Sequence, residues 1–324
     1  MYLFASRLVT TESEGYRVKI TNVCTGTLIC KYGTVQSFGM ALDFNAAPRD
    51  DHLNSPKGVA VTPDSSFVIV CDSQNDRVQM LRLVVDGNTA NLEFVRSIGS
   101  SPPNSSDQSK LREGYLVRPT FVALLPGAAG GQQTMLITDT SNKGVSQFEL
   151  DGTFIRIFAG KKDDEKDGGG GGSGSRPSSG QLDFPKGITV LASSGEVAII
   201  SVGCTVQIFD REGNYKRQFG SYGTEDGQFS TLSTIGHGGL ASDACGNILI
   251  VDYGSHRLQV FNAQGTHLCT RSDFGIGMDE YDQVTKAIAW STGGRLALAT
   301  CGVEIGMGAN NPGVVRVWYQ TGSE

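Results

Sequence analysis

The sequence has no long apolar run and little of the residue chemistry from which metal sites and redox enzymes are recognised. No window approaches the roughly 18 apolar residues that a membrane span requires. There are four histidines, and the seven cysteines show no C-x-x-C spacing, which excludes a zinc knuckle and a thioredoxin-like motif. The N-terminus lacks the basic and apolar leader of a signal peptide. These absences predict a cytoplasmic chain that does not enter a membrane and holds no metal or other cofactor.

A helical repeat is also absent, because no segment places apolar residues at a 3.6-residue period. Basic residues are too few for a general polyanion binder, since the formal net charge is −6 and the pI is about 5.3. Short runs rich in Val, Ile and Phe alternate instead with tight turns that contain glycine, asparagine or aspartate. This pattern is typical of an all-β chain.

The chain is built from an internal repeat. Four units begin at Pro56, Pro119, Pro185 and Gly238 and end at Gly99, Gly160, Gly220 and Gly275. Within each unit the runs predict four short antiparallel strands, which we name a to d in chain order. A repeated four-stranded unit of this length is what a β-propeller blade requires.

Partial units at both ends bring the expected number of blades to six. The first partial unit supplies strands b, c and d, and the last supplies a, b and c, so both are expected to be three-stranded. We therefore predict a single propeller domain over residues 1–324. The tract at 161–180 combines charged residues with a Gly/Ser run, and it is interpreted as a low-complexity, flexible insertion between blades.

Three segments resemble the NHL-repeat family. PKGVAVTPDSSFVIVCDSQNDRVQM (56–80) and GLASDACGNILIVDYGSHRLQVF (239–261) are similar to its repeat pattern, and GSYGTEDGQF (220–229) is similar to its inter-repeat linker. In that family the propeller often follows a RING finger, a B-box or a coiled coil. The resemblance therefore implies a six-bladed propeller that takes part in substrate recognition within a ubiquitin-ligase-like assembly.

Acidic and basic residues recur at the turn between strands b and c. Repetition of a residue at the same place in each unit indicates architecture rather than a single site. The residues interpreted as structural on this ground are Asp72, Arg77, Asp139, Asp252 and Arg257.

A functional surface is expected where the turns between b and c and the long connections from d to the next a lie on one face. Elaborated loops on a rigid scaffold commonly carry function. The candidate partner-binding residues on this face are Lys57, Lys186, Tyr222, Tyr253 and His256. We expect them to contact a protein partner, with single-stranded RNA as the alternative ligand.

Two kinds of propeller enzyme are the alternatives to an interaction scaffold. The peptidylamidoglycolate lyases, which are similar in repeat pattern, take zinc-binding histidines from the second position of each unit. No histidine occupies that position here; Lys57 and Lys186 do in two units. These lysines also disfavour the calcium site of lactonase-type propellers. The sequence thus predicts a non-enzymatic interaction scaffold.

Overall fold

The structure is a computed structural model, and it describes residues 2–4, 7–13, 15–22, 24–33, 52–99, 114–128, 131–160, 179–201, 203–230, 239–255, 257–272, 284–290, 295–301 and 315–319. Contacts divide the chain into two compact units, unit 1 at Met1–Asp164 and unit 2 at Glu165–Glu324. The boundary lies in the tract 161–180, of which residues 161–178 fall outside the described part of the chain.

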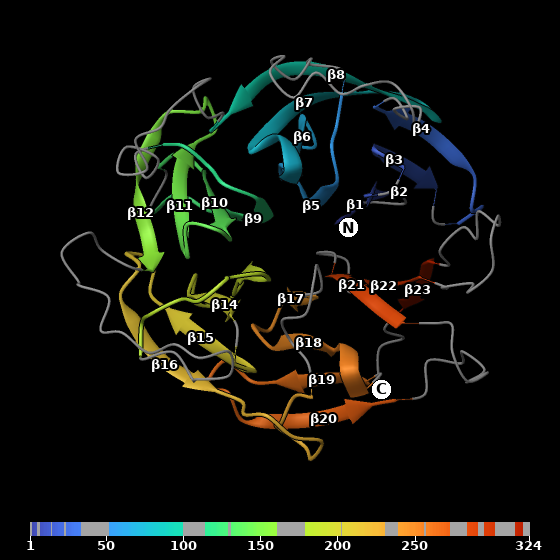
Figure 1. Cartoon of the computed structure of the whole chain (residues 1–324). Helices are drawn as coiled ribbons and strands as arrows, with labels where there is room; N and C mark the ends of the chain where they lie inside the picture. The colour runs from blue at the N-terminus through green and yellow to red at the C-terminus, as the bar shows by residue number, and fades with distance from the viewer. Residues whose placement is uncertain are drawn as a thin grey trace, which may run out of the picture. The chain divides into compact units, whose positions relative to one another are not determined.

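Unit 1 contains three four-stranded antiparallel sheets, each a meander in which neighbours in sequence are neighbours in the sheet (Figure 1). The first sheet consists of β1 (Tyr2–Phe4), β2 (Arg7–Glu12), β3 (Arg17–Asn22) and β4 (Leu28–Tyr32). The second consists of β5 (Pro56–Val61), β6 (Phe67–Asp72), β7 (Arg77–Asp86) and β8 (Thr89–Ile98), with the 3-10 turn η1 (Ser73–Asn75) between β6 and β7. The third consists of β9 (Pro119–Leu125), β10 (Thr134–Asp139), β11 (Gly144–Glu149) and β12 (Phe154–Gly160).

Unit 2 contains two four-stranded sheets and, among its described residues, one three-stranded sheet. The first sheet consists of β13 (Ile188–Val190), β14 (Val197–Ser201), β15 (Thr205–Phe209) and β16 (Tyr215–Phe219). The second consists of β17 (Leu240–Ser242), β18 (Ile248–Asp252), β19 (Arg257–Phe261) and β20 (His267–Arg271), with η4 (Tyr253–Ser255) between β18 and β19. The third consists of β21 (Val284–Trp290), β22 (Arg295–Cys301) and β23 (Val315–Tyr319).

The first sheet differs from the sequence-based expectation, because it has four described strands and not three. The run YLFASR was interpreted as one strand b, but β1 pairs back onto β2 with Phe4 opposite Arg7. Only two residues connect these strands, and neither is glycine, proline or asparagine, so the strongest turn signals are missing from the sequence. The last sheet has the three strands that the sequence predicts.

Several tight turns owe their shape to an acidic residue that starts a D-x-x-G-N sequence. In the turn between β15 and β16, Asp210 Oδ1 accepts the backbone N–H groups of Glu212 (3.0 Å) and Asn214 (2.8 Å). Gly213 supplies the positive φ of 87° that this turn requires. The same letters, DACGN, form the turn from Asp243, where Gly246 has a φ of 84°.

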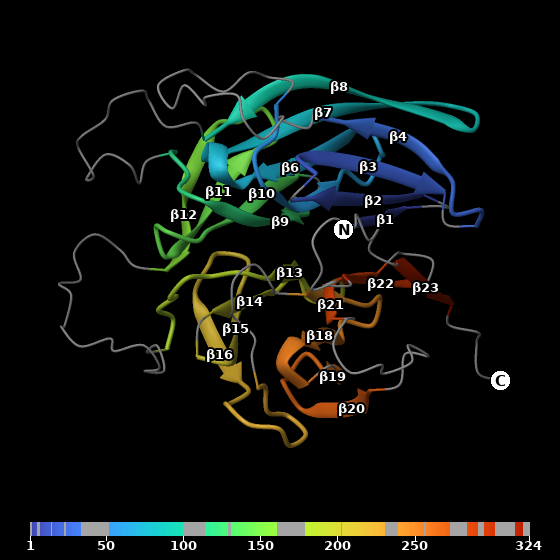
Figure 2. The same cartoon turned by 45° about the vertical axis from the view of Figure 1, so that its right-hand side comes forward.

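The core of unit 1 lies between successive sheets. Strands β6, β10 and β11 are buried over nearly their whole length, because neighbouring sheets cover both faces. Val9 and Ile20 of the first sheet pack with Val68 and Leu81 of the second. The ten-residue strands β7 and β8 extend this contact, since β8 runs beside β4 (Figures 1 and 2). Burial of each such aliphatic side chain contributes about 1.5–3 kcal/mol.

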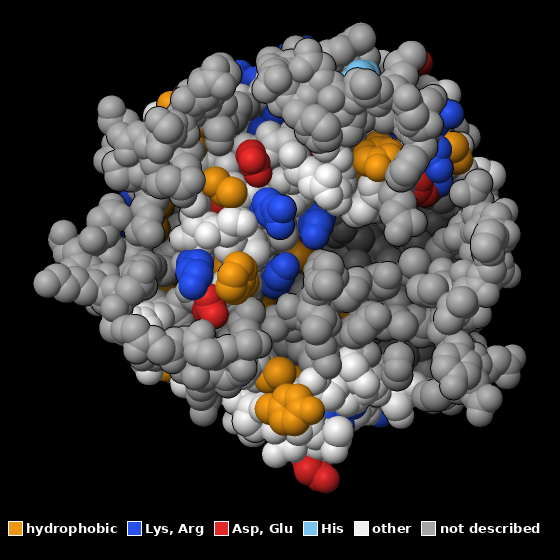
Figure 3. Space-filling view, in the orientation of Figure 1, with side chains coloured by type: hydrophobic (Ala, Val, Ile, Leu, Met, Phe, Trp, Pro, Cys, Tyr) orange, Lys and Arg blue, Asp and Glu red, His pale blue; other side chains and the backbone are white. Residues whose placement is uncertain are grey.

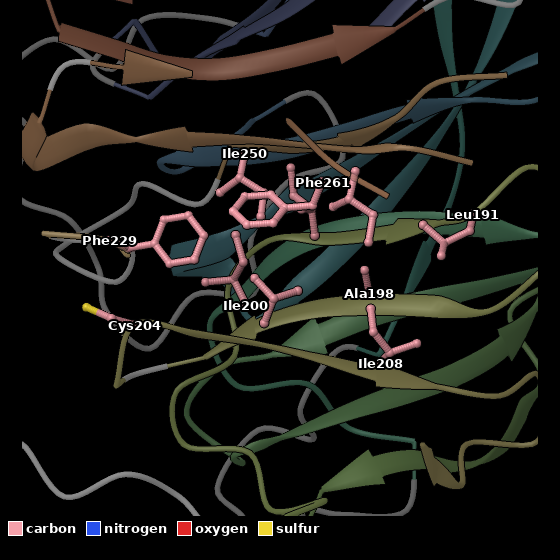
Figure 4. Close-up of a cluster of buried hydrophobic side chains, with 11 residues drawn as sticks. Leu191, Ala198, Ile200, Cys204, Ile208, Phe229, Ile250 and Phe261 are labelled. Carbon is pink, nitrogen blue, oxygen red and sulfur yellow. The ribbon is translucent and has the colours of Figure 1, made fainter. Parts of the chain in front are cut away.

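Unit 2 has an equivalent core between its first two sheets (Figure 4). Ile200 and Ile208 meet Ile250 and Phe261 there, and all four side chains are fully or almost fully buried. Aromatic contacts close the cluster, with the ring of Phe261 centred 5.6 Å from that of Phe229. Phe229 belongs to the segment that leads toward β17, so the core also fixes the connection between the two sheets.

An arginine brace joins successive sheets within each unit. Arg96 of β8 donates to the carbonyl of Asp151, in the turn between β11 and β12. Arg217 of β16 donates to the carbonyl of Ala263, which lies in the turn between β19 and β20, at 3.1 Å through Nε. Arg7 of β2 likewise donates to the carbonyl of Gly87 (2.7 Å). In each case the acceptor is the c–d turn of the next sheet.

Candidate functional site

A buried ion pair closes the turn between strands b and c of the second sheet. Asp72 ends β6 and Arg77 begins β7, and Arg77 Nε donates to Asp72 Oδ2 at 2.8 Å. The carboxylate also accepts the backbone N–H of Asn54 (2.6 Å), while Arg77 Nη2 donates to the carbonyl of His52 (2.9 Å). The pair therefore fixes both the b–c turn and the segment that enters strand a. We call the carboxylate at the end of strand b and the arginine at the start of strand c the clamp.

The second sheet of unit 2 (β17 to β20) repeats the clamp with Asp252 and Arg257. Arg257 Nε donates to Asp252 Oδ2 at 3.0 Å, and Asp252 Oδ1 accepts the N–H of Ser230 at 3.1 Å. The remaining guanidinium nitrogens of Arg257 donate to the carbonyls of Thr224, Glu225 and Gln228. Arg257 is thus the centre around which the loop at 221–229 is built.

Sequence reasoning missed two parts of this arrangement. Glu12 and Arg17 form a clamp in the first sheet, where they pair across β2 and β3. Their spacing of five residues is that of Asp72 and Arg77, which is the signal that identifies them. Glutamine two residues after the arginine is the second part: Gln259 Oε1 accepts the N–H of Gly227 and its Nε2 donates to Gln228 O.

The clamp is incomplete in the third sheet, where Gly144 stands in place of the arginine. Asp139 is buried, and its carboxylate accepts the N–H of Val117 (2.8 Å) and the side-chain amide of Asn142 (2.7 Å). Burial without a neighbouring guanidinium raises the pKa of Asp139 to about 7. This carboxyl group therefore changes its charge in the physiological range.

The first sheet of unit 2 (β13 to β16) has neither residue of the clamp. Ser201 and Thr205 face each other across the ends of β14 and β15, at the places of the carboxylate and the arginine. Both hydroxyl groups are buried, and neither finds a hydrogen-bond partner among the described residues. Burying an unpaired hydroxyl is unfavourable, so this turn is the weakest version of the repeat.

The turns between b and c and the segments that enter strand a share one edge of their sheets, as the sequence predicted. Gln74 N donates to Asn54 O (3.0 Å), and Ser141 N donates to Val117 O (3.2 Å). In unit 2, Ser255 Oγ donates to Ser230 Oγ (2.8 Å). We call this the loop edge; in unit 1 it comprises residues 52–57, 73–76, 116–120 and 140–143.

Two basic side chains meet at the loop edge of unit 1. Lys57 is half-buried at the start of β5, and burial lowers the pKa of its ammonium group, which the neighbouring guanidinium of Arg118 lowers further. Arg118 is exposed, and its backbone N–H donates to Asp76 Oδ1 at 2.7 Å. The positive charge of Arg118 also acts on the carboxyl group of Asp76, whose pKa it lowers against the effect of burial. Figure 3 shows several exposed Lys and Arg side chains on the face in view.

The other candidate partner-binding residues lie in unit 2. Lys186 is half-buried two residues before β13. Tyr222 is 78% exposed on the loop that Arg257 organises. Tyr253 begins η4 at the loop edge, and His256 lies outside the described residues. The structure brings Lys57 together with Arg118, a residue that the sequence did not single out.

Left-handed backbone at residues other than glycine is concentrated at the loop edge. Eight described residues other than glycine have a φ between 44° and 59°. Four directly precede strand c (Tyr16, Asp76, Lys143 and Cys204) and three directly precede the proline of strand a (Ser55, Arg118 and Phe184). Such strain is retained where the surroundings over-determine the backbone, and it gathers at functional sites.

Neither a metal cluster nor a membrane-spanning segment is found in the part of the chain that the structure describes. No group of three or more His, Cys, Asp or Glu residues converges there as metal ligands would. Within the same residues, no helix has the length and apolar character needed to cross a membrane.

Comparison with known proteins yields matches at the level of structure only. No protein-family model and no curated protein matches the sequence. A catalytically inactive variant of virginiamycin B lyase from Staphylococcus aureus, solved with quinupristin, is 13% identical, with a TM-score of 0.51 over 91% of this chain and 73% of that chain. A streptogramin B lyase structure is 10% identical, with a TM-score of 0.50 over 98% of this chain and 80% of that chain.

The chain is a β-propeller. Its sheets are the blades, and at 10–13% identity the match shows the fold alone. The prediction that the protein is not an enzyme is contradicted by the same matches, because the solved propellers that it resembles are lyases. The absence of the zinc and calcium ligands of two other enzyme groups does not exclude an enzyme, because a propeller supports chemistry from other positions as well.

Proposed function

We propose that this propeller binds a protein partner through the loop edge of unit 1, and that it recognises an acidic segment of that partner. The observation that carries the proposal is the placement of two basic residues at the starts of the neighbouring strands β5 and β9, where Lys57 is half-buried and Arg118 is exposed. The charge of Arg118 lowers the pKa of Lys57 and is partly balanced by the carboxyl group of Asp76. An incoming carboxylate would gain charge-assisted hydrogen bonds from both basic side chains. Binding of this kind serves an enzyme as well as a scaffold.

The surroundings of the pair favour a peptide carboxylate over RNA. Binding of single-stranded RNA needs a continuous basic groove and aromatic side chains for base stacking. Asp76 lies next to Arg118, and burial raises the pKa of its carboxyl group while the Arg118 N–H opposes this. Asp76 and the net charge of −6 oppose any polyanion and do not separate the two ligands. The loop edge of unit 1, as defined above, contains no Phe, Tyr or Trp on which bases could stack, and this disfavours RNA.

The resemblance to NHL repeats extends the proposal to a biological setting. On that resemblance, the acidic segment belongs to a substrate that the propeller presents within a ubiquitin-ligase-like assembly. Lys186, Tyr222, Tyr253 and His256 are proposed to contact other parts of the partner.

Fluorescence anisotropy with a labelled hexaglutamate peptide tests the proposal. Lys57→Gln is expected to weaken binding about tenfold, because it removes one of two cations. Lys31→Gln is the matched control, since Lys31 is exposed on β4 and is not one of the residues that make up the loop edge of unit 1. An oligouridine of twelve nucleotides forms the second arm.

The proposal fails if Lys57→Gln and Lys31→Gln bind the peptide equally well. It also fails if oligouridine binds the wild-type chain more tightly than the peptide does, which would make RNA the ligand of this edge.

A further inference from the structure

Three blades share an unusual backbone position directly before strand a. The residue there precedes the proline that opens the strand segment, and its φ lies between 44° and 54° in every case. These residues are Ser55, Arg118 and Phe184. The shared conformation shows that the repeat imposes this backbone, whatever side chain is present.

The position is strained for all three residue types. Left-handed backbone brings the Cβ atom of an L-residue too close to its own carbonyl oxygen, and a following proline further restricts the residue before it toward extended conformations. Glycine would adopt this φ without strain. The chain contains 43 glycines and places none at these three positions, so the side chain is retained at a cost in stability.

Hydrogen bonds from two blades hold Arg118 in this conformation. Asp139 Oδ1 accepts the N–H of Val117 at 2.8 Å, immediately before it. Asp76 Oδ1, from the preceding blade, accepts the N–H of Arg118 itself at 2.7 Å. In the second blade, Asp72 accepts the N–H of Asn54 next to Ser55 in the same way. The clamp carboxylates therefore position this residue as well as the turn.

The side chains at this position reach the surface and differ in chemistry. Arg118 is exposed beside Lys57, Phe184 is 42% exposed, and Ser55 is half-buried. A fixed backbone with a variable, outward side chain is the pattern of a recognition position on a repeat scaffold.

We propose that the residue before the strand-a proline is a recognition position in these three blades, and that Arg118 is the one that receives the carboxylate of the acidic segment. This inference rests on the proposed function and assigns the recognising residue. Asp76, Asp139 and Val117 then serve to present Arg118, and the left-handed backbone is maintained for binding.

Three variants separate binding from strain. Arg118→Gly removes both the guanidinium and the strain, Arg118→Ala removes the guanidinium and keeps the strain, and Arg118→Lys keeps the charge. Arg82→Ala, at an exposed arginine of β7, is the control. Hexaglutamate binding is expected to fall about tenfold in the Gly and Ala variants and to be largely retained in the Lys variant and the control.

Thermal unfolding of the same variants supplies the second readout. The melting temperature of Arg118→Gly is expected to exceed that of Arg118→Ala by about 2 °C or more, because only glycine relieves the left-handed backbone. A residue that merely supports the fold would lose stability in both variants.

The outcomes distinguish this inference from the proposed function. Wild-type binding that depends on Lys57 but survives in Arg118→Gly overturns the inference alone. A glycine variant that is less stable than the alanine variant also overturns it. Failure of the wild-type chain to bind hexaglutamate overturns the proposed function, and the assignment of Arg118 falls with it.

Discussion

A single side-chain position, the carboxylate at the end of strand b, behaves differently from blade to blade because its partners differ. Asp72 and Asp252 are fully buried opposite arginines. Asp139 is nearly as buried, but its neighbour across the turn is Gly144. Burial raises the pKa of both Asp72 and Asp139, but only Asp72 has an arginine that opposes this effect, and the pKa of Asp139 is raised to about 7.

Asp139 is expected to make stability depend on pH. The native state keeps the proton up to about pH 7, whereas the unfolded chain releases it near 3.8. The native state binds more protons between these values, so the free energy of unfolding falls as pH rises from about 4 to 7. Asp139→Asn retains an acceptor for Val117 N–H, and a flip of the Asn142 amide restores the second bond.

Urea unfolding at pH 5 and pH 8 checks this prediction. Asp139→Asn should lose most of the pH dependence and should be more stable than wild type at pH 8. Asp86→Asn, at an exposed aspartate of β7, should keep the wild-type profile. An unchanged pH profile in Asp139→Asn would contradict the assignment.

Arg257 and Tyr222 are expected to respond in opposite ways to replacement. Arg257→Ala leaves the buried carboxylate of Asp252 unpaired and removes the donor to three carbonyls, so it should cost about 3 kcal/mol of stability. Tyr222→Ala removes a side chain that is 78% exposed and should stay within about 0.5 kcal/mol of wild type. Chemical denaturation measures both, and equal losses would show that the loop itself is a packed element.

At the scale of the element, the hairpin of strands b and c could be predicted wherever its sequence recurs in another unit. The alternation of apolar residues, the D-x-x-G-N turns and the five-residue spacing of Asp72 and Arg77 are local features, and they fixed the strands of the complete units. The pairing of β1 with β2 was missed, since a two-residue connection without glycine or proline leaves no local signal.

Most of the candidate site could not be predicted in this way. Lys57 was selected from its place in the repeat, but Arg118 and Asp76 are brought to it by contacts between blades. The left-handed backbone at Arg118 was also hidden, because no glycine or asparagine marks it in the sequence. Neither the period of the apolar residues nor the spacing of a motif predicts contacts between residues that are 40 or more positions apart in the sequence.

The β14–β15 hairpin of the fourth blade is expected to gain stability from a loss of polarity. Thr205→Val replaces a buried hydroxyl that has no hydrogen-bond partner among the described residues with a methyl group of similar size, and it should stabilise the chain by about 1 kcal/mol. Thr138→Val is the matched control, because the Thr138 hydroxyl bonds to Thr120 and to Phe121 N–H (2.8 Å).

The control variant should lose about 1 kcal/mol or more, since it leaves buried partners unsatisfied. Urea unfolding of both variants gives the comparison. Destabilisation of Thr205→Val as large as that of Thr138→Val would show that the hydroxyl of Thr205 has a partner in solution.

At the scale of the whole molecule, the boundary between the two compact units falls in the tract 161–180. Its residues are mostly charged residues, glycine and serine, which offer little apolar surface for burial. We expect deletion of residues 163–178 to leave the melting temperature within a few degrees of wild type, because loop length has a small effect on the free energy of folding. A fall of ten degrees or more in differential scanning calorimetry would show that the tract packs against the propeller.

The arginine braces impose a direction on the assembly of the chain. Each guanidinium finds its acceptor 80, 55 or 46 residues further along, for Arg7, Arg96 and Arg217 respectively. A ribosome that adds roughly 5–20 residues per second therefore delivers each acceptor on the order of seconds after its donor. Each of these three hydrogen bonds can therefore form only after the c–d turn of the following blade has been synthesised, and a chain that stops before that turn leaves the arginine without this acceptor.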